Sequence, residues 1–361
     1  MEVHPDLMIT EMENGMERQP RARPCRWMSE EYEPGLVSVI IPTYNRAHLV
    51  TEAMDSVYSQ TYRPIELIVV DDGSTDNTPK VLEEWGKGHS GDSQFELRTF
   101  RQENKGASAA RNLGAANCKG GFIIWHDSDD LMLPKRVELP LKRLLEFDAD
   151  ACVCGWEREG GKSLPPKVPG GVIIGYVAGM FDRSTIVWLY RRSLLQRIHR
   201  WREYLICWDD PCFFLDWILS LPAPSVATVP KVLCESRLTS GSIISRNHSR
   251  GDFEGRLLFL KDKLRETEDS YDPALYRQVM AREAAAAAVQ SYRRFPALSG
   301  NFMEVWREFG GGASWSLSWF RRLVWALGGV PACSAYGQVM AYTRLLPPRL
   351  YDLCASRGKL H

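Results

Sequence analysis

An alternation of apolar runs and amphipathic segments, repeated from residue 36 to residue 148, is the feature that most constrains this chain's fold. The runs at 37–42 and 66–70 are short and rich in β-branched residues, which is typical of buried strands. Further strands are expected at 95–101 and 122–125. The segments between them carry apolar residues three and four apart, so each is predicted to be a helix with one buried face. This order predicts an α/β fold, an α/β/α sandwich around a mainly parallel mixed sheet.

The alternation weakens after Asp150. One more strand is expected at 151–156, a strand leading into a helix near 187–192, and a helix at 210–219. From Gly251 onward the pattern is helical, and the alanine run at 284–288 strongly favours a helix. We therefore expect a polar, mobile N-terminal extension (1–35), an α/β half (36–148), a second half (149–250) and a helical C-terminal extension (251–361).

Composition narrows the possible partners and surroundings. The 45 basic and 45 acidic side chains give a formal charge of zero, so no general attraction to nucleic acid is expected. Nine scattered cysteines without metal-binding spacing predict reduced thiols and a cytoplasmic location. The first 35 residues lack the apolar core of a secretory signal. The uncharged segment 323–343 is interrupted by glycine and proline, so we expect a packed helical pair there, with peripheral contact to the inner face of the membrane as the alternative.

Three pairs or clusters of aspartate follow predicted strands or open a predicted helix. They lie at 71–72, 127–130 and 209–210. In an open α/β sheet, ligands bind at the carboxyl ends of the strands. Clustered carboxylates raise one another's pKa unless a cation compensates, and Mg²⁺ or Mn²⁺ binds carboxylate oxygens together with phosphates. The sequence thus predicts a divalent-metal site. The alternative is that these acids only cap helices or turn loops, and for Asp76 we adopt that alternative.

Four consecutive segments resemble the signature segments of family 2 glycosyltransferases. They are VSVIIPTYNRAHLV, ELIVVDDGSTDNTPKVL, RQENKGASAARNLGA and GFIIWHDSDDLMLPKRV. The resemblance is specific from 37 to 137 and continues more weakly to about 245. It implies the GT-A fold, in which 36–148 would bind a nucleotide sugar and 149–250 would bind the acceptor and carry the catalytic base. It also implies transfer of the sugar with inversion.

The resemblance further implies which residues form the donor site. Thr43 and Tyr44 would lie against the nucleotide base, with Asp72 at its edge. Asp129 would bind the metal that bridges the diphosphate, and Asp127 would lie near the ribose or also bind the metal. The full implied donor set is Pro42, Thr43, Tyr44, Arg46, Asp72, Arg111, Asp127, Ser128 and Asp130. For Arg111, contact with the base or phosphates and a structural salt bridge are equally compatible with the sequence.

The implied catalytic base comes from the segment CWDDPCFFLDWIL, where the family has an acidic pair that opens a helix. Its second acid, Asp210, would take the acceptor proton, with Asp209 as the alternative. Asp210 precedes Pro211 and is also suited to cap the helix, and both roles are compatible. One departure is Thr239, which stands where the family often has histidine. Arg237 nearby would either pair with the diphosphate or be solvated.

The resemblance and these residues together predict a metal-assisted glycosyltransferase. The resemblance implies a nucleotide-diphosphate sugar as donor, with UDP as the default nucleotide and GDP or dTDP as alternatives, and the acceptor is a glycan, a glycolipid or another hydroxyl compound. A sugar nucleotidyltransferase would need a glycine-rich, lysine-containing loop where this chain has PTYNRAH. The other alternative is a nucleotide-sugar-binding protein without turnover. An oxidoreductase is disfavoured because no G-x-G-x-x-G follows the first strand.

Overall fold

The computed structural model describes residues 27–29, 32–158, 184–205, 208–220, 225–237, 249–266, 273–291 and 294–310. Most of the predicted N-terminal extension, Thr239, and the whole segment 323–343 lie outside these ranges.

Strands and helices alternate through the first half of the chain, as predicted. In chain order they are β1 (Glu33–Thr43), α2 (Val50–Tyr58), β2 (Ile65–Asp71), α3 (Thr78–Gly88), β3 (Phe95–Arg101), α4 (Ala107–Asn117), β4 (Gly120–Trp125), β5 (Leu131–Met132), α5 (Glu138–Glu146) and β6 (Ala151–Arg158). The later elements are the 3-10 helix η1 (Thr185–Val187), β7 (Trp188–Arg191), α7 (Arg192–Leu195), α8 (Asp209–Ser220), β8 (Val226–Ser236), α9 (Arg250–Glu266), α10 (Pro273–Ser291) and α11 (Pro296–Glu308).

Within the described residues the strands form one mixed sheet of order β3-β2-β1-β4-β7-β6-β8-β5. β1 pairs in parallel with both β2 and β4, β2 with β3, and β6 with β8. The antiparallel pairs involve β7 and the two-residue strand β5. The predicted mainly parallel sheet is therefore confirmed.

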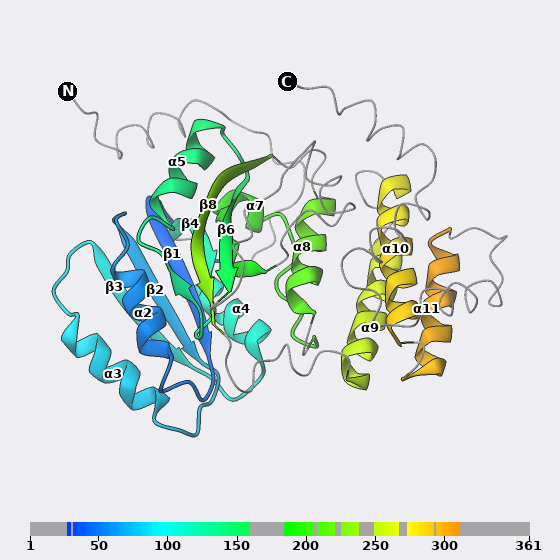
Figure 1. Ribbon diagram of the computed structural model, residues 1–361, viewed down its shortest axis with the longest axis horizontal. Coiled ribbons are helices and arrows are strands. Elements are labelled where there is room, and N and C mark those ends of the chain that lie inside the picture. Colours follow the sequence, from blue (N-terminus) through cyan, green and yellow to red (C-terminus); the bar gives the residue numbers. More distant parts are fainter. Residues whose placement is uncertain are drawn as a thin grey trace.

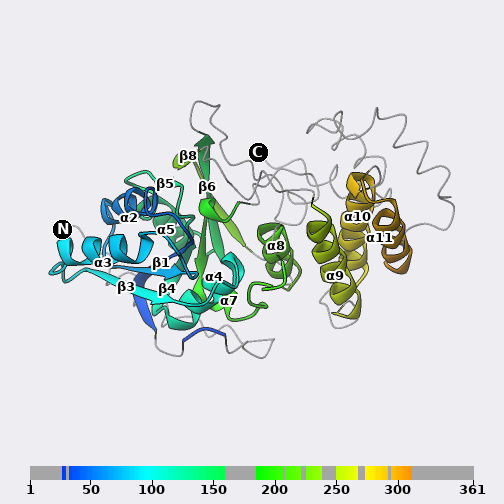
Figure 2. The same cartoon turned by 90° about the horizontal axis from the view of Figure 1, so that it is seen from below.

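Helices cover both faces of this sheet. Figure 2 shows α2, α3 and α5 on one side and α4 and α7 on the other, which is the sandwich that the sequence predicted. β2 is buried along its whole length, as its continuous apolar run requires. On the opposite face α4 approaches the sheet closely at Gly114, where an added Cβ would lie 2.5 Å from Cγ2 of Ile40.

Beyond the sheet, α8 is followed by the helices α9, α10 and α11, which lie side by side (Figure 1). The predicted helical pattern after Gly251 is confirmed as far as residue 308. No helix in the described ranges is both long enough and apolar enough to span a bilayer.

One predicted helix start was wrong. Pro134 is suited to a first helical position, so the sequence predicts a helix that opens there, but α5 begins at Glu138. Residues 133–137 instead form a turn, held by hydrogen bonds from Leu133 N to Leu233 O and from Thr61 N to Pro134 O. The helix expected at 210–219 is confirmed as α8, which the acidic pair opens, but Asp210 lies inside the first turn and is not the N-cap.

Candidate active site

The carboxyl ends of three neighbouring parallel strands bring the predicted donor residues to one edge of the sheet. β1 and β2 pair Pro42 with Val70 and Thr43 with Asp71. Beyond the last pair, Asp72 N donates to Thr43 O at 2.8 Å. On the other side of β1, His126 N donates to Ile40 O at 3.0 Å, so residues 127–130 emerge at this same edge.

The loop after β1 is pinned to the loop after β2. Asn45 has a φ of 52° and accepts a hydrogen bond from Thr75 N at 2.8 Å. Asp76 accepts from Thr78 N at 2.9 Å and from Ala47 N at 3.3 Å, which agrees with its interpretation as a structural residue that turns a loop. Tyr44 is left 43% exposed beside this pinned loop, whereas Thr43 is buried.

Asp72 shapes the entrance to α4. Its carboxylate accepts hydrogen bonds from Lys105 N and Gly106 N, both at 2.8 Å, and from Gln102 Nε2 at 2.7 Å. Gly106 has a φ of 92°, a conformation that favours glycine, and α4 begins at the next residue. The predicted contact of Asp72 with a nucleotide base stays a prediction.

Arg111, on α4, connects two of the acidic clusters. Its Nη1 lies 2.7 Å from Oδ2 of Asp209, and its Nη2 lies 2.9 Å from Oδ1 of Asp127 and 3.9 Å from Oδ1 of Asp210. The guanidinium stacks over the ring of Trp201, 4.5 Å from the centroid. Burial by itself would lower the pKa of Arg111, but the carboxylates of Asp209 and Asp127 outweigh it and raise that pKa. The salt bridge considered from the sequence is thus present, and it is made to the candidate site residues themselves.

Asp210 lies at the start of α8 with 21% of its side chain exposed. Its Oδ2 accepts from Thr185 N at 3.3 Å, while its Oδ1 is buried and makes no hydrogen bond within the described residues. Burial, and then the charge of Asp209, raise the pKa of Asp210 well above its ordinary range. A partly exposed carboxylate with a raised pKa is suited to accept a proton.

The cluster at 127–130 concentrates negative charge in partly buried surroundings. Burial and the charges of Asp127 and Asp129 raise the pKa of Asp130 to about 8. Asp130 Oδ1 accepts from Arg237 N at 3.0 Å, and Asp129 Oδ2 lies 3.7 Å from Nη2 of Arg46. The Nε–H of Arg237 donates to Asp129 O at 2.5 Å and its side chain is 11% exposed, so Arg237 packs against this cluster and is not simply solvated.

His126 and Ser128 flank the first carboxylate of this cluster. Ser128 is buried, and His126 Nε2 lies 3.1 Å from the carbonyl oxygen of Asp130. Burial lowers the pKa of His126 to about 4, so its ring is neutral at physiological pH.

The acidic cluster has the donor chemistry of a hard-metal site that a phosphate completes. No group of three or more histidine, cysteine or acidic side chains is arranged to hold a metal ion among the described residues. Mg²⁺, however, is commonly held by one or two carboxylates plus substrate phosphates and water. The carboxylates of Asp127 and Asp129 fit that requirement, and the raised pKa of Asp130 reflects negative charge that a cation would offset.

Two residues beside the acidic pair were not predicted as site residues. Thr185 donates its backbone N–H to Asp210, and Trp208 precedes Asp209 with a φ of 64°. Neither has a local pattern that would reveal it, because a backbone donor can be any residue but proline and a tryptophan seldom adopts a left-handed conformation.

Comparison with known families finds a match over the part of the chain that holds most of these residues. The model described as Glycosyl transferase family 2 matches residues 38–199. An uncharacterized glycosyltransferase of Rickettsia typhi is 40% identical over 134 residues, which cover 37% of this chain and 39% of that protein. Glycosyltransferase GlyA of Streptococcus pneumoniae is 37% identical over 117 residues, 32% of this chain and 16% of GlyA. The chain thus spans well under half the length of these curated relatives.

Solved structures are similar over more of the chain. Residues 1–349 of TarS from S. aureus, in complex with UDP-GlcNAc, give a TM-score of 0.57 at 20% identity and cover 88% of this chain and 83% of that one. The mannosyltransferase PcManGT from Pyrobaculum calidifontis, in complex with GDP-Man and Mn²⁺, gives 0.51 at 18% identity, covering 98% and 94%. At these identities the likeness establishes the fold.

Proposed function

Residues 38–199 of this chain belong to glycosyl transferase family 2, and from that premise we propose that the protein transfers a sugar from a nucleotide-diphosphate donor to an acceptor hydroxyl with inversion. The observation that carries the proposal is the position of Arg111. It pairs with Asp127, in the D-x-D segment after β4, and with Asp209, at the start of α8. One guanidinium thereby holds both a carboxylate of the proposed donor site and the acidic pair that contains the candidate base.

In this proposal Asp210 is the base. Its carboxylate, on a side chain that is 21% exposed, would take the proton of the acceptor hydroxyl as the acceptor oxygen bonds to the anomeric carbon and the bond to the departing nucleoside diphosphate breaks. The N–H of Thr185 donates to Oδ2 of this carboxylate at 3.3 Å, which orients the side chain. Asp209 is already bonded to Arg111 and is the less favoured base.

On the donor side, the residues at the sheet edge supply surface and orientation. The exposed ring of Tyr44 offers a face for the nucleotide base, beside the buried Pro42 and Thr43. Asp127 and Asp129 would hold Mg²⁺ or Mn²⁺, and the ion, when bound, would offset charge that develops on the leaving diphosphate. Arg46 and Asp130, with Ser128, complete the proposed donor site.

UDP remains the first choice of nucleotide, supported by the UDP-GlcNAc complex of the TarS structure. A GDP donor is the second choice, supported by the GDP-Man complex of PcManGT. For the acceptor we retain a glycan, a glycolipid or another hydroxyl compound. A cytoplasmic location with peripheral membrane contact through the C-terminal region stays a prediction from the sequence.

The test is release of nucleoside diphosphate from a panel of UDP and GDP sugars, with and without Mn²⁺, in the presence of candidate acceptors. Donor binding is followed separately by the shift in melting temperature. Asp210→Asn should lower kcat by on the order of 10³-fold, because the base is removed while the shape is kept. Asp148→Asn, at a 42% exposed position beside α5, is the matched control and should leave kcat unchanged.

Each alternative predicts a different result. Donor binding without any release of nucleoside diphosphate would indicate a binding protein. Formation of a sugar nucleotide from a sugar phosphate and a nucleoside triphosphate would indicate a nucleotidyltransferase. Asp210→Asn with kcat within about tenfold of wild type would exclude Asp210 as the base.

A further inference from the structure

Trp208, the residue directly before the acidic pair, has an unusual backbone conformation. Its φ of 64° lies in the left-handed region, where a bulky side chain is rare and the strain must be compensated by surrounding contacts. Those contacts come from α9. The guanidinium of Arg256 lies 4.0 Å from the centroid of the Trp208 ring, and the ring of Phe259 packs edge-on against it at 6.3 Å. Helix α9 thus contacts the residue directly before α8.

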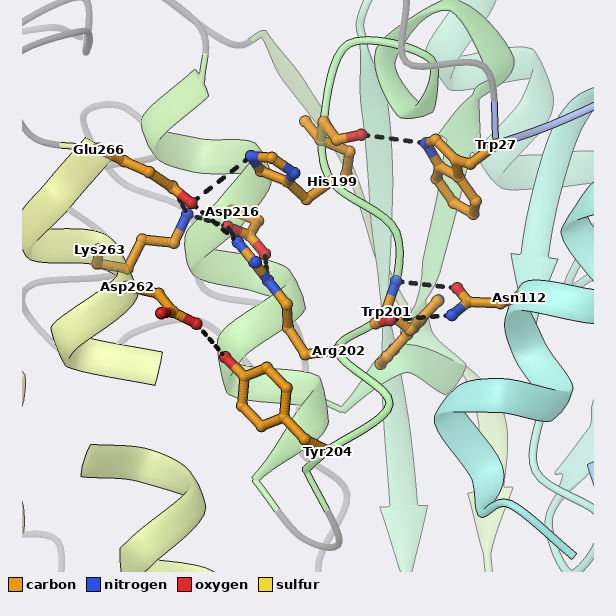
Figure 3. Close-up of polar contacts among 11 residues, drawn as sticks. Trp27, Asn112, His199, Trp201, Arg202, Tyr204, Asp216, Asp262, Lys263 and Glu266 are labelled. Carbon is orange, nitrogen blue, oxygen red and sulfur yellow. Dashed lines mark hydrogen bonds and ion pairs between the residues drawn. The ribbon is translucent and has the colours of Figure 1, made fainter. Parts of the chain in front are cut away.

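A second contact with α9 lies about two turns farther along α8. Asp216 of α8 forms an ion pair with Lys263 of α9, and their side chains are 1% and 3% exposed. Arg202 joins them, with its Nε 3.4 Å from Asp216 Oδ2 and its Nη2 3.3 Å from Glu266 Oε1 (Figure 3). Charges this deeply buried need their partners, so the pair fixes α8 against α9 at one relative position.

The segment around Arg202 leads directly to Arg111. Its neighbour Trp201 stacks face to face on Phe213 of α8, with centroids 4.1 Å apart and planes 3° apart. Trp201 also contacts α4. Asn112 of α4 forms hydrogen bonds with the backbone O and N of Trp201, at 2.9 and 3.0 Å (Figure 3), and the Arg111 guanidinium lies over the Trp201 ring. Contacts therefore run without interruption from α9 to the arginine that binds Asp209.

From these contacts we infer that α9 positions the acidic pair Asp209–Asp210 for catalysis, with Trp208 and Lys263 as the positioning residues. The inference rests on the proposed function and assigns a role to a helix outside the family match, which ends at residue 199. It requires that loss of either contact displaces the base relative to the donor while the donor site on β1, β2 and β4 stays intact. A displacement of about 1 Å at a reacting group lowers turnover by up to roughly 100-fold.

The experiment uses the full chain and measures kcat, the acceptor KM and the donor Kd for wild type and two variants. Lys263→Met removes the buried charge. Trp208→Asn removes the ring but keeps a residue that tolerates a left-handed backbone. Both should lower kcat roughly 10- to 100-fold, while the donor Kd and the acceptor KM change by less than about threefold. Lys261→Met is the matched control, since Lys261 is exposed on the same helix and should leave all three constants unchanged.

Stability is measured in parallel, because Lys263→Met leaves Asp216 buried without its main partner. If that variant fails to fold, Trp208→Asn and the double variant Asp216→Asn/Lys263→Met, which leaves no unpaired charge from this couple, carry the test. Unchanged kcat in folded variants would overturn the inference. An increase confined to the acceptor KM would also overturn it, because it would mean that Trp208 touches the acceptor. Absence of turnover by the wild type would instead overturn the proposed function.

Discussion

Arg111→Met removes the cation that connects Asp127 with Asp209, and its effect on stability can be worked out from the structure. At the observed separations of 2.7 and 2.9 Å, each pair of unit charges attracts by roughly 6 kcal/mol at an effective dielectric constant of about 20. Much of this is offset by the desolvation of the guanidinium, whose side chain is 5% exposed. Breaking a buried pair typically costs about 3–5 kcal/mol. The carboxylates of Asp127 and Asp209 keep 32% and 19% exposure, so we expect the lower end, about 3 kcal/mol.

The assay is urea unfolding at neutral pH, followed by tryptophan fluorescence, with the free energy of unfolding taken from the midpoint and the slope. Arg143→Met is the matched control: its side chain is 43% exposed, it pairs with Glu146 on α5, and its loss should change stability by less than about 0.5 kcal/mol. Arg111→Lys should fall between wild type and Arg111→Met, because an ammonium lacks the planar fork that reaches two carboxylates. A loss below about 1 kcal/mol for Arg111→Met would refute the view that this side chain holds the acidic clusters together.

Two further predictions concern packing and pH. Gly114→Ala on α4 should destabilise the protein by about 1–3 kcal/mol, because the added Cβ would meet Ile40. Gly300→Ala on α11 has no atom within 4 Å of the added Cβ and should stabilise the protein by about 0.5–1 kcal/mol. Urea unfolding of both variants measures these changes, and equal effects would contradict the packing argument. Burial alone would raise the pKa of Asp76, but the hydrogen bonds from Thr78 and Ala47 outweigh it and lower that pKa below 3.8. The stability that Asp76 contributes is therefore present above about pH 4 and is lost as the pH falls through the lowered pKa, so the difference between wild type and Asp76→Asn should shrink with acidification; a constant difference would show that the charge of Asp76 is irrelevant.

The first half of the fold could be predicted because its signals are local. The strand expected at 95–101 is β3, and the ends of β1, β2 and β4 fall within a few residues of their predicted positions. Each of these strands is a short run of residues whose hydropathy differs from that of the segments before and after it. Once the strands are parallel, the positions of Asp72 and of residues 127–130 at one edge follow from the topology.

The contacts that organise the candidate site could not be predicted, because they join segments far apart in the chain. Arg111 was equally compatible with a phosphate contact and a salt bridge, and the sequence held no indication that its partners would be Asp127 and Asp209, 16 and 98 residues away. The start of α5 was mispredicted for a similar reason. Pro134 suits a first helical position, but the backbone of Leu133 is bonded to β8 and delays the helix.

Helix α4 is the element that relates the two ends of the candidate site to each other. Its entrance is fixed by the hydrogen bonds from Lys105 and Gly106 to Asp72, and Arg111 follows five residues later, about 7.5 Å along the axis. The close contact at Gly114 seats the same helix against β1 and β2. The spacing between Asp72 and the acidic pair of α8 is therefore a property of one rigid helix and its fit to the sheet, not of the loops between them. A substitution that lifts α4 from the sheet should consequently impair donor binding and proton transfer together, whereas a change in α9 should impair the second alone.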